Sequence, residues 1–359
     1  MNRLKKIERF WFKLINWEQW HYNLKYVLLA PVWLWYSLRA RTFYFFVPVN
    51  PTLTFGGFEG GSKKEMYNQL PPEYYPKSIY IDSNASFESV MSSIRERDFS
   101  FPLAVKPNIG MMGLLFRKIN NESELAIYHL AISVEYILQE LIGYPMEVSV
   151  FYYRFPNSQT GAITGFVRKE SLVVAGDGSS TIEQLMEVFK GRPGYNAEEW
   201  KGKHSNRLND VLGKGEIFKL SWVANLSRGS RLISLEHEKD ARLVALLDRF
   251  SHAAKHYYYG RYDIKCTSIN ELKEGKNFCI LEFNGAGAEP HHMYGNKNSF
   301  GQACRIIIHH WDVLYKIARY NNRQGVKYPS LYEGLTFTRK ANKHFKTLRQ
   351  MDAAIPFFQ

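Results

Sequence analysis

Cysteine is scarce in this chain of 359 residues, which contains only Cys266, Cys279 and Cys304. Their number is odd and their spacing matches no metal-binding pattern, so the sequence excludes a disulfide framework and a cysteine-based metal site. Two of the three stand in apolar runs, where a buried free thiol is ordinary. We therefore expect a protein of a reducing compartment, the cytoplasm.

Long apolar runs are also missing. Residues 26–38 carry no charge, but this run has only 13 residues and Pro31 interrupts it. A helix needs about 20 apolar residues to cross a bilayer. The run also starts too late, and lacks the small-residue cleavage pattern, for a secretory signal. We expect neither a membrane-spanning helix nor a signal peptide.

Acidic residues are outnumbered, because 34 Asp and Glu face 47 Lys and Arg and give a net charge of +13. Such a charge indicates an anionic partner: a nucleotide, a nucleic acid or an anionic lipid surface. No recognisable nucleic-acid module accompanies the basic residues, so nucleic acid is the least favoured of the three. With 45% hydrophobic and 23% charged residues, the chain is expected to be globular.

The first 50 residues differ in composition from the rest. They contain five of the eight tryptophans (Trp11, Trp17, Trp20, Trp33, Trp35), and eight Lys or Arg against two acids. Aromatic residues mixed with basic ones are typical of segments that lie in a membrane interface. One hypothesis is that residues 1–59 form a peripheral anchor on the inner, cytoplasmic membrane face. The other is that the aromatics pack on the body of the protein or on a second subunit, and the oligomeric state stays open.

Turn residues, helix caps and the periodicity of apolar residues predict the order of the helices and strands. We expect helices over residues 62–69, 86–97 (capped by Asn84 or Ser86), 121–133, 236–257 and 298–323. We expect strands over residues 76–81, 101–107, 114–119, 135–142, 148–154, 161–169, 261–266 and 277–284, and a strand pair over 215–226. Ser180 and Glu183 form a capping box, and residues 191–215 are expected to be a long surface loop with a short helix.

Two of these strands carry metal-ligand chemistry. Asp263 stands in the first, and Glu282 and Asn284 stand in the second. A carboxylate inside a strand is costly to desolvate unless something pairs with it. An all-oxygen ligand set suits Mg²⁺, particularly Mg²⁺ that also holds nucleotide phosphates. The alternative is two amphipathic strands that each carry one solvent-facing acid.

Two further stretches carry nucleotide-binding chemistry. Lys106 ends a strand, and the turn after it contains Gly110 and Gly113, whose missing side chains let backbone N–H groups approach an anion. Glu140 and Glu147 are seven residues apart at the ends of two successive strands, a spacing that can place one carboxylate near a base and one near a ribose. The alternatives are a plain hairpin with a surface lysine and two solvated glutamates.

The ordered set of motifs resembles the ATP-grasp superfamily, on the side of D-alanine–D-alanine ligase and cyanophycin synthetase. The resemblance covers residues 60–325 and rests on motifs in the family order, at 104–107, 137–147, 176–183, 216–227, 261–264 and 281–284. It implies an α+β fold in which two subdomains, about 60–135 and 136–325, clasp ATP. Residues 326–359 would be a basic tail, which we expect to be a solvated or membrane-facing arm.

The resemblance also implies a role for each matching residue. Lys106 would contact the α- and β-phosphates, with the glycine loop above them. Glu140 and the backbone at Leu141 would read the adenine, and Glu147 would accept from the ribose. The remaining matches lie on the two acidic strands: Asp263, Glu282 and Asn284 would hold one or two Mg²⁺, and Arg261 would steady an acyl phosphate. A second phosphate-binding lysine would be Lys63, Lys64 or Lys77.

The implied activity is an ATP-dependent carboxylate–amine ligase that forms an amide through an acyl phosphate. The alternatives are an ATP-grasp kinase acting on a hydroxyl, and a non-catalytic membrane-surface protein on the same scaffold. The sequence departs from the family at Met111 and Met112 in the glycine loop, in the absence of a full preceding domain, and in residues 285–292. The last of these includes His291 and His292, one of which either orients the substrate or acts as a base, or which are merely polar surface. The carboxylate and amine therefore cannot be taken over from D-alanine ligases.

Overall fold

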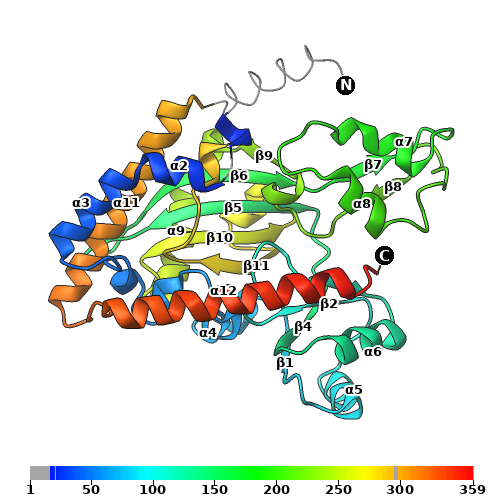
Figure 1. Ribbon diagram of the computed structural model, residues 1–359, viewed down its shortest axis with the longest axis horizontal. Helices are drawn as coiled ribbons and strands as arrows, with labels where there is room; N and C mark the ends of the chain where they lie inside the picture. Colours follow the sequence, from blue (N-terminus) through cyan, green and yellow to red (C-terminus); the bar gives the residue numbers. More distant parts are fainter. Residues whose placement is uncertain (1–16, 21, 295–297, 359) are drawn as a thin grey trace.

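The computed structural model describes residues 17–20, 22–294 and 298–358, and these form two lobes of mixed helix and sheet (Figure 1). Trp11 lies outside these residues. The described part of the chain contains three antiparallel sheets, of four, five and two strands. The predicted α+β class is therefore confirmed.

The first lobe is built on the four-stranded sheet, in the order β1-β4-β2-β3. Its strands are β1 (Ser78–Ile81), β2 (Leu103–Pro107), β3 (Arg117–Ile119) and β4 (Tyr136–Glu140). Helices α5 (Phe87–Glu96) and α6 (Glu122–Ala131) share a core with these strands. Because β4 pairs with both β1 and β2, this lobe runs to Glu140, past the division expected near residue 135.

The helices of this lobe begin where short polar residues can cap them. Ser86 caps α5 by accepting a hydrogen bond from the N–H of Ser89, which decides between Asn84 and Ser86. Asn121 caps α6 in the same way through Glu124 N–H. A cap satisfies amides that the first helical turn leaves unpaired, so these boundaries are readable from the sequence.

The second lobe is built on the five-stranded sheet, in the order β11-β10-β5-β6-β9. Its strands are β5 (Met146–Tyr153), β6 (Ala162–Glu170), β9 (Arg231–Ser234), β10 (Tyr259–Cys266) and β11 (Phe278–Asn284). One face packs on α9 (Ala241–Ala253) and α10 (Ile269–Lys273), and Val150, Tyr262 and Leu247 are fully buried there. Because side chains alternate along a strand, every second residue of β5 and β10 faces the other way.

A small unit is inserted between β6 and β9, at the upper right of Figure 1. In it β7 (Val173–Ala175) pairs with β8 (Ile217–Lys219), and α7 (Ile182–Met186) and α8 (Ala197–Lys203) enclose a core around Trp200. The strand pair expected over 215–226 is wrong, because the Ser221 hydroxyl bonds to Val223 backbone and bends the chain after β8. The capping box lies one residue later than expected, on Thr181 and Gln184, since Ser180 donates instead to Asp177.

The N-terminal segment packs two helices, α2 (Tyr22–Leu28) and α3 (Ala30–Ala40), beside α11 (Phe300–Arg323). Trp17 stacks on Tyr294 with ring centroids 5.5 Å apart, and Trp33 packs edge-on against Trp311 at 5.0 Å. Packing on the body of the protein is thus confirmed for Trp17 and Trp33. Trp35 differs, because it is 58% exposed. None of the helices in the described ranges has the length and apolar content that crossing a bilayer requires.

Short helices complete the connections. Helix α4 (Lys63–Tyr67) follows a glycine-rich loop, and its N-cap is Ser62. The 3-10 helices are η1 (Trp17–Gln19), η2 (Val47–Val49), η3 (Thr54–Gly57), η4 (Pro72–Tyr74), η5 (Glu187–Phe189), η6 (Leu226–Arg228), η7 (Glu236–Glu238) and η8 (His291–Met293).

The basic C-terminal stretch is not a free arm but a packed helix, α12 (Leu331–Ala354), although its five basic residues between 339 and 349 are exposed. Phe345 and Leu348 are buried in the core of the first lobe, and Phe357 reaches the core of the inserted unit. The basic residues of 339–349 occupy other positions of the helix, and an amphipathic helix can hold both sets at once. Figure 1 shows α12 crossing the front of the molecule between the lobes.

Asp352, near the end of α12, joins three parts of the chain. Its carboxylate accepts from Leu115 N–H at 2.8 Å and from the buried Arg117 guanidinium at 2.9 Å, and Arg228 of the inserted unit lies at 3.5 Å. Burial would raise the pKa of Asp352, but Arg117, Leu115 N–H and Arg228 together lower it. The charged form of Asp352 therefore stabilises the folded state.

We expect Asp352→Asn to lower the free energy of unfolding at pH 7 by about 1.5–3 kcal/mol, because hydrogen bonds to a charged group are replaced by neutral ones. A lowered folded-state pKa gives stability that is present above the unfolded pKa of about 3.9 and is lost as pH falls through the folded value. Denaturant titrations should therefore show the deficit shrinking in acid. Asp210→Asn, in an ion pair with Arg207 that is about 40% exposed, is the control, and an equal loss there would contradict this assignment.

Candidate active site

The face of the five-stranded sheet that does not pack on α9 is polar at one end, whereas at the other end Phe151 and Tyr259 pack against α11. Glu147 and Ser149 of β5 lie opposite Lys265 and Asp263 of β10. Asp263 lies opposite Glu282 of β11, and Arg261 lies opposite Asn284. Directly opposed residues of antiparallel strands have Cβ atoms about 5 Å apart. The register therefore gathers on one surface the four residues predicted from the two acidic strands.

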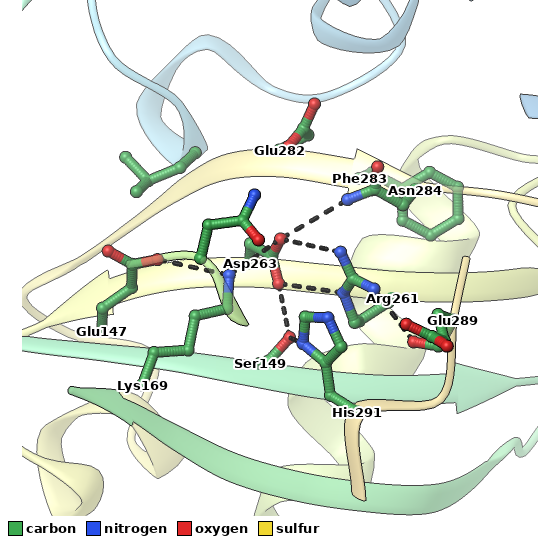
Figure 2. A network of polar contacts seen from close by, with 12 residues as sticks. Glu147, Ser149, Lys169, Arg261, Asp263, Glu282, Phe283, Asn284, Glu289 and His291 are labelled. Atoms are coloured by element: carbon green, nitrogen blue, oxygen red, sulfur yellow. Dashed lines mark hydrogen bonds and ion pairs between the residues drawn. The ribbon is translucent and has the colours of Figure 1, made fainter. Parts of the chain in front are cut away.

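Asp263 is the centre of this network, as Figure 2 shows. Its carboxylate lies 3.0 Å from Lys169 Nζ and 3.2 Å from Arg261 Nε, and it accepts a hydrogen bond from the Ser149 hydroxyl. The Asn284 amide donates to it at 3.4 Å. Two cations thus face one carboxylate that is only 7% exposed.

The charges in this network fix one another's ionisation. Burial would raise the pKa of Asp263, but Arg261 and Lys169 outweigh it and hold the pKa far below its usual range. Burial would lower the pKa of Lys169, but Asp263 and Glu147 outweigh it and raise it. Glu147, 3.2 Å from Lys169 Nζ, has a raised pKa because burial and the nearby Asp263 outweigh Lys169 and Lys265. The pKa shifts of Asp263 and Lys169 favour their charged forms, with positive charge close to the carboxylates.

Glu282 and two lysines form the side of the site nearest the first lobe. Lys63 Nζ lies 3.1 Å from Glu282 and donates to the Gly110 carbonyl at 3.2 Å. Lys106 Nζ donates to the Leu281 carbonyl at 3.3 Å and to the Tyr67 hydroxyl at 3.1 Å. Burial lowers the pKa of Lys106, against the effect of Glu282, and the pKa of Glu282 is lowered because Lys63 outweighs its burial.

Of the three candidates for a second phosphate-binding lysine, only Lys63 points into this site. Lys64 Nζ lies over the Tyr80 ring at 5.0 Å, and Lys77 Nζ lies over the Phe99 ring at 4.8 Å. Neither Lys64 nor Lys77 lines the cavity described below. Among the three lysines that the sequence left open, position therefore favours Lys63 as the second phosphate-binding lysine.

A cavity of about 890 Å³ lies between the lobes and joins these residues. At one end it is lined by Glu140 and Leu141, at the end of β4, and by Glu147. At the other it is lined by Lys25, Glu289 and Tyr294, and α12 adds Asn342 and Arg349. All ten residues predicted for the site line this one cavity: Lys106, Gly110, Gly113, Glu140, Leu141, Glu147, Arg261, Asp263, Glu282 and Asn284.

The glycine loop covers the cavity from the first lobe. Gly113 has a φ of +70°, and a Cβ there would meet the Val223 side chain of the inserted unit at 3.0 Å. Met111 and Met112, where the sequence departs from the family it resembles, also line the cavity. Shortly after the loop, Leu115 N–H donates a hydrogen bond to Asp352, which ties this stretch to α12.

The two neighbouring histidines lie inside the protein. His291 lines the cavity, and its Nδ1 lies 3.3 Å from the Ser149 hydroxyl. His292 is buried against Gly165 and beside the His310 ring, at 5.4 Å between centroids. The polar-surface interpretation is therefore wrong for the buried His292, whereas His291 is of intermediate exposure and lines the cavity. Burial lowers the pKa of both imidazoles, to about 4 for His292.

The donor set fits a hard divalent cation by its chemistry. Asp263, Glu282 and Asn284 supply carboxylate and amide oxygens on one sheet face, as Mg²⁺ prefers. No group of three or more His, Cys, Asp or Glu within the described ranges has metal-site geometry, which is consistent because the third residue here is Asn. Both carboxylates are held by cations, Asp263 by Lys169 and Glu282 by Lys63.

Three residues of this network have no motif that singles them out in the sequence: Lys169, Ser149 and Lys265. Lys169 is expected only as the end of a strand. Alternation within β6 places Lys169 on the face of buried Val167 and away from Phe166, which was a readable signal. No sequence signal pairs Lys169 with Asp263, because that contact depends on the strand order β10-β5-β6.

Comparisons with known proteins give similarity at the level of structure. No family model and no curated protein matches the sequence. A D-alanine–D-alanine ligase from Bacillus anthracis matches with a TM-score of 0.40 and 12% identity, over 74% of this chain and 69% of that one. The VanG D-Ala:D-Ser ligase from Enterococcus faecalis matches with a TM-score of 0.40 and 15% identity, over 71% and 61%.

A bifunctional glutathione synthetase from Pasteurella multocida matches with a TM-score of 0.37 and 14% identity, over 70% of this chain and 36% of that one. This chain therefore spans about a third of the synthetase and less than two thirds of the VanG ligase.

Proposed function

We propose that the chain is an Mg²⁺-dependent ATP-grasp ligase that joins a small-molecule carboxylate to an amine. One observation supports this most directly. Lys63 of α4 and Lys106 of the first lobe meet the carboxylates and Arg261 of the β10–β11 face in a single cavity. Phosphates and a divalent cation are the ligand chemistry that such a mixture of opposite charges accommodates.

The nucleotide would lie along the cavity from β4 to β11. Glu140 and Leu141 would border the adenine, and Glu147 would accept from the ribose. Lys106 and Lys63 would face the phosphates, with backbone N–H groups of the glycine loop above. Lys169 is a third cation within reach of them, because its Nζ is shared between Glu147 and Asp263.

Asp263, Glu282 and Asn284 would hold the metal. When bound, Mg²⁺ neutralises phosphate charge and makes the γ-phosphorus a better electrophile. A magnesium nucleotide carries negative phosphates and a divalent cation. In the site these two kinds of charge are supplied by the carboxylates and the lysines, which pair with each other. Its phosphates would attract Lys63 and Lys169, and these lysines are the groups that face the two carboxylates.

The chemistry would follow in two displacements. A carboxylate oxygen of the first substrate attacks the γ-phosphorus, the bond to the β–γ bridging oxygen breaks, and an acyl phosphate and ADP form. The amine nitrogen then attacks the acyl carbon, phosphate leaves, and the nitrogen loses its proton as the amide forms. The protein would contribute positioning and fixed charge, with Arg261 beside the transferred phosphate. Arg261 is held for this by Asp263 and by the Glu289 carbonyl at 2.9 Å.

Lys106→Ala should weaken binding of a non-hydrolysable magnesium–ATP analogue by about 10–100-fold, because a buried charge-assisted contact to phosphate is lost. Titration calorimetry on the whole chain measures this directly. Lys77→Ala is the matched control, since Lys77 stands on the same lobe but outside the cavity, and it should bind as the wild type does. Equal affinity of Lys106→Ala and wild type would overturn the placement of the nucleotide.

Product analysis tests the reaction class separately. A ligase supplied with a carboxylate, an amine and ATP releases ADP and one equivalent of free phosphate per amide. A kinase releases ADP while its phosphate stays on the substrate hydroxyl. Nucleotide binding with ADP formation but without free phosphate would therefore replace the ligase assignment by a kinase.

A further inference from the structure

The outward side of the two N-terminal helices is apolar. The exposed apolar positions are i, i+3 and i+4 in α2 and i, i+1 and i+4 in α3, in each case the spacing of one helix face. They are Leu24 (45% exposed), Val27 (64%), Leu28 (52%), Leu34 (50%), Trp35 (58%) and Leu38 (75%). Large apolar side chains exposed singly are ordinary, but a row of six along two consecutive helices marks an interaction site.

The opposite side of the same helices packs on the body of the protein, so the exposed row belongs to helices that are held in place. Lys25 is 3% exposed and contacts Glu289 at 3.6 Å, and Leu29 and Tyr36 are each 8% exposed. Trp33 packs on Phe45 and Trp311. The exposed row is therefore held in place on the surface.

The row continues onto the loop after α3 and onto the first turns of α12. Phe43 and Leu331 line one shallow surface pocket together with Arg41, which places the end of the row beside α12. Phe43 is 52% exposed, and Leu331 is 62% exposed. Tyr332 (79%) and Leu335 (41%) follow on α12. We call these ten residues, from Leu24 to Leu335, the apolar face.

The charge beside the apolar face has one sign along the N-terminal segment. Arg39 and Arg41 are exposed, and the Arg39 guanidinium lies 5.8 Å from the Trp35 ring. Between Glu18 and Glu59 the sequence contains no acidic residue. On α12, Glu333 is an exposed acid between Tyr332 and Leu335, and its carboxylate accepts hydrogen bonds from Ser330 N–H and Oγ; on α11, Asp312 pairs with Lys316.

We propose that the apolar face binds the surface of an anionic lipid bilayer. Leucines would enter the acyl boundary, Trp35 and Tyr332 would lie at the headgroup level, and the arginines would meet lipid phosphates. A second copy of this chain fits less well. A two-fold contact through the face would bring two sets of Arg39 and Arg41 into one interface, and residues 19–58 of neither copy offer a carboxylate to pair with them.

The position of the face relates it to the cavity, although it does not depend on the proposed reaction. Lys25 lines the cavity from the inner side of α2, while Leu24, Val27 and Leu28 stand on the outer side. The bilayer would thus lie about one helix diameter, roughly 10 Å, from one end of the cavity.

Flotation of the full-length chain with lipid vesicles tests this. The wild type should float with vesicles of phosphatidylcholine and phosphatidylglycerol, and should do so weakly with phosphatidylcholine alone or in high salt. Trp35→Glu combined with Leu38→Glu should reduce the bound fraction about tenfold or more, because two apolar side chains that would be buried in the bilayer become charged. Leu130→Glu is the matched control, since Leu130 is 82% exposed on α6 of the other lobe, and it should float as the wild type does.

Three results would overturn the proposal. The first is a wild type that stays unbound on anionic vesicles. The second is equal flotation of the Trp35/Leu38 variant and wild type. The third is a dimer, seen by light scattering, that this variant converts to monomer without any lipid binding, because a second copy would then be the occupant. Matching far-ultraviolet circular dichroism of variant and wild type ensures that a loss of binding is not a loss of folding.

Discussion

Glu282→Gln should reduce ATP-dependent ADP formation about 10²–10³-fold while the protein stays folded, because the substitution removes one carboxylate from the proposed metal set and keeps its shape. Glu282 is 32% exposed towards the cavity, and its partner Lys63, 11% exposed, keeps its hydrogen bond to the Gly110 carbonyl at 3.2 Å when Glu282 is neutral. A coupled assay for ADP under saturating nucleotide measures the effect. The apparent Mg²⁺ concentration for half-maximal rate should rise as well, and chelation of Mg²⁺ should stop the wild-type reaction.

Glu274→Gln is the control for this experiment. Glu274 is a glutamate in an exposed pair with Lys276, 3.1 Å away, and it does not line the cavity. It should keep wild-type activity. If Glu282→Gln also kept wild-type activity and metal dependence, β11 would not carry the metal, and the proposed site would be wrong at its centre.

Lys169→Met should lower the free energy of unfolding at pH 7 by about 3–5 kcal/mol, because removing one partner of a buried ion pair leaves charge uncompensated. Lys169 is 6% exposed at its side chain and lies within 3.2 Å of Glu147 and 3.0 Å of Asp263. Denaturant unfolding followed by circular dichroism measures the loss. The variant should also bind the nucleotide analogue more weakly, since a cation of the cavity is gone.

The loss should depend on pH in a known direction. Without Lys169, the folded-state pKa values of Glu147 and Asp263 rise, and a raised carboxyl pKa destabilises the folded state at every pH above the unfolded value, about 4. As pH falls towards that value the carboxyls take up protons in both states. The deficit of Lys169→Met should therefore be largest at neutral pH and smaller in mild acid.

Arg168→Met separates this effect from a general effect of the strand. Arg168 immediately precedes Lys169 in β6. It pairs with Glu170, and the two side chains are 38% and 39% exposed. A surface pair of this kind contributes about 0–1 kcal/mol. Similar losses in the two variants would mean that Lys169 acts only by filling space and that the charge network is not what stabilises this part of the lobe.

The position of α12 shows where sequence reasoning fails. A run of five basic residues without an acid reads as solvated, and charge alone gives no sign of Phe345 and Leu348 on the other side of the helix. Their partners are in the first lobe, more than two hundred residues earlier, as for Asp352 and Leu115. The packing of a helix is set by the apolar surface available to it, and that surface exists only after the lobe has formed.

The sequence by itself determined the two acidic strands and the hairpin that carries Lys106, because alternation, turn residues and caps act over a few neighbours. It also determined that Asp263, Glu282 and Asn284 could share one face, since register in a two-stranded pair follows from the apolar pattern. Only the tertiary structure decided that Lys63 rather than Lys64 or Lys77 enters the cavity, and that Lys169 pairs with Asp263. Those contacts join different lobes and non-consecutive strands, and electrostatic pairing at such range depends on the position of every element between them.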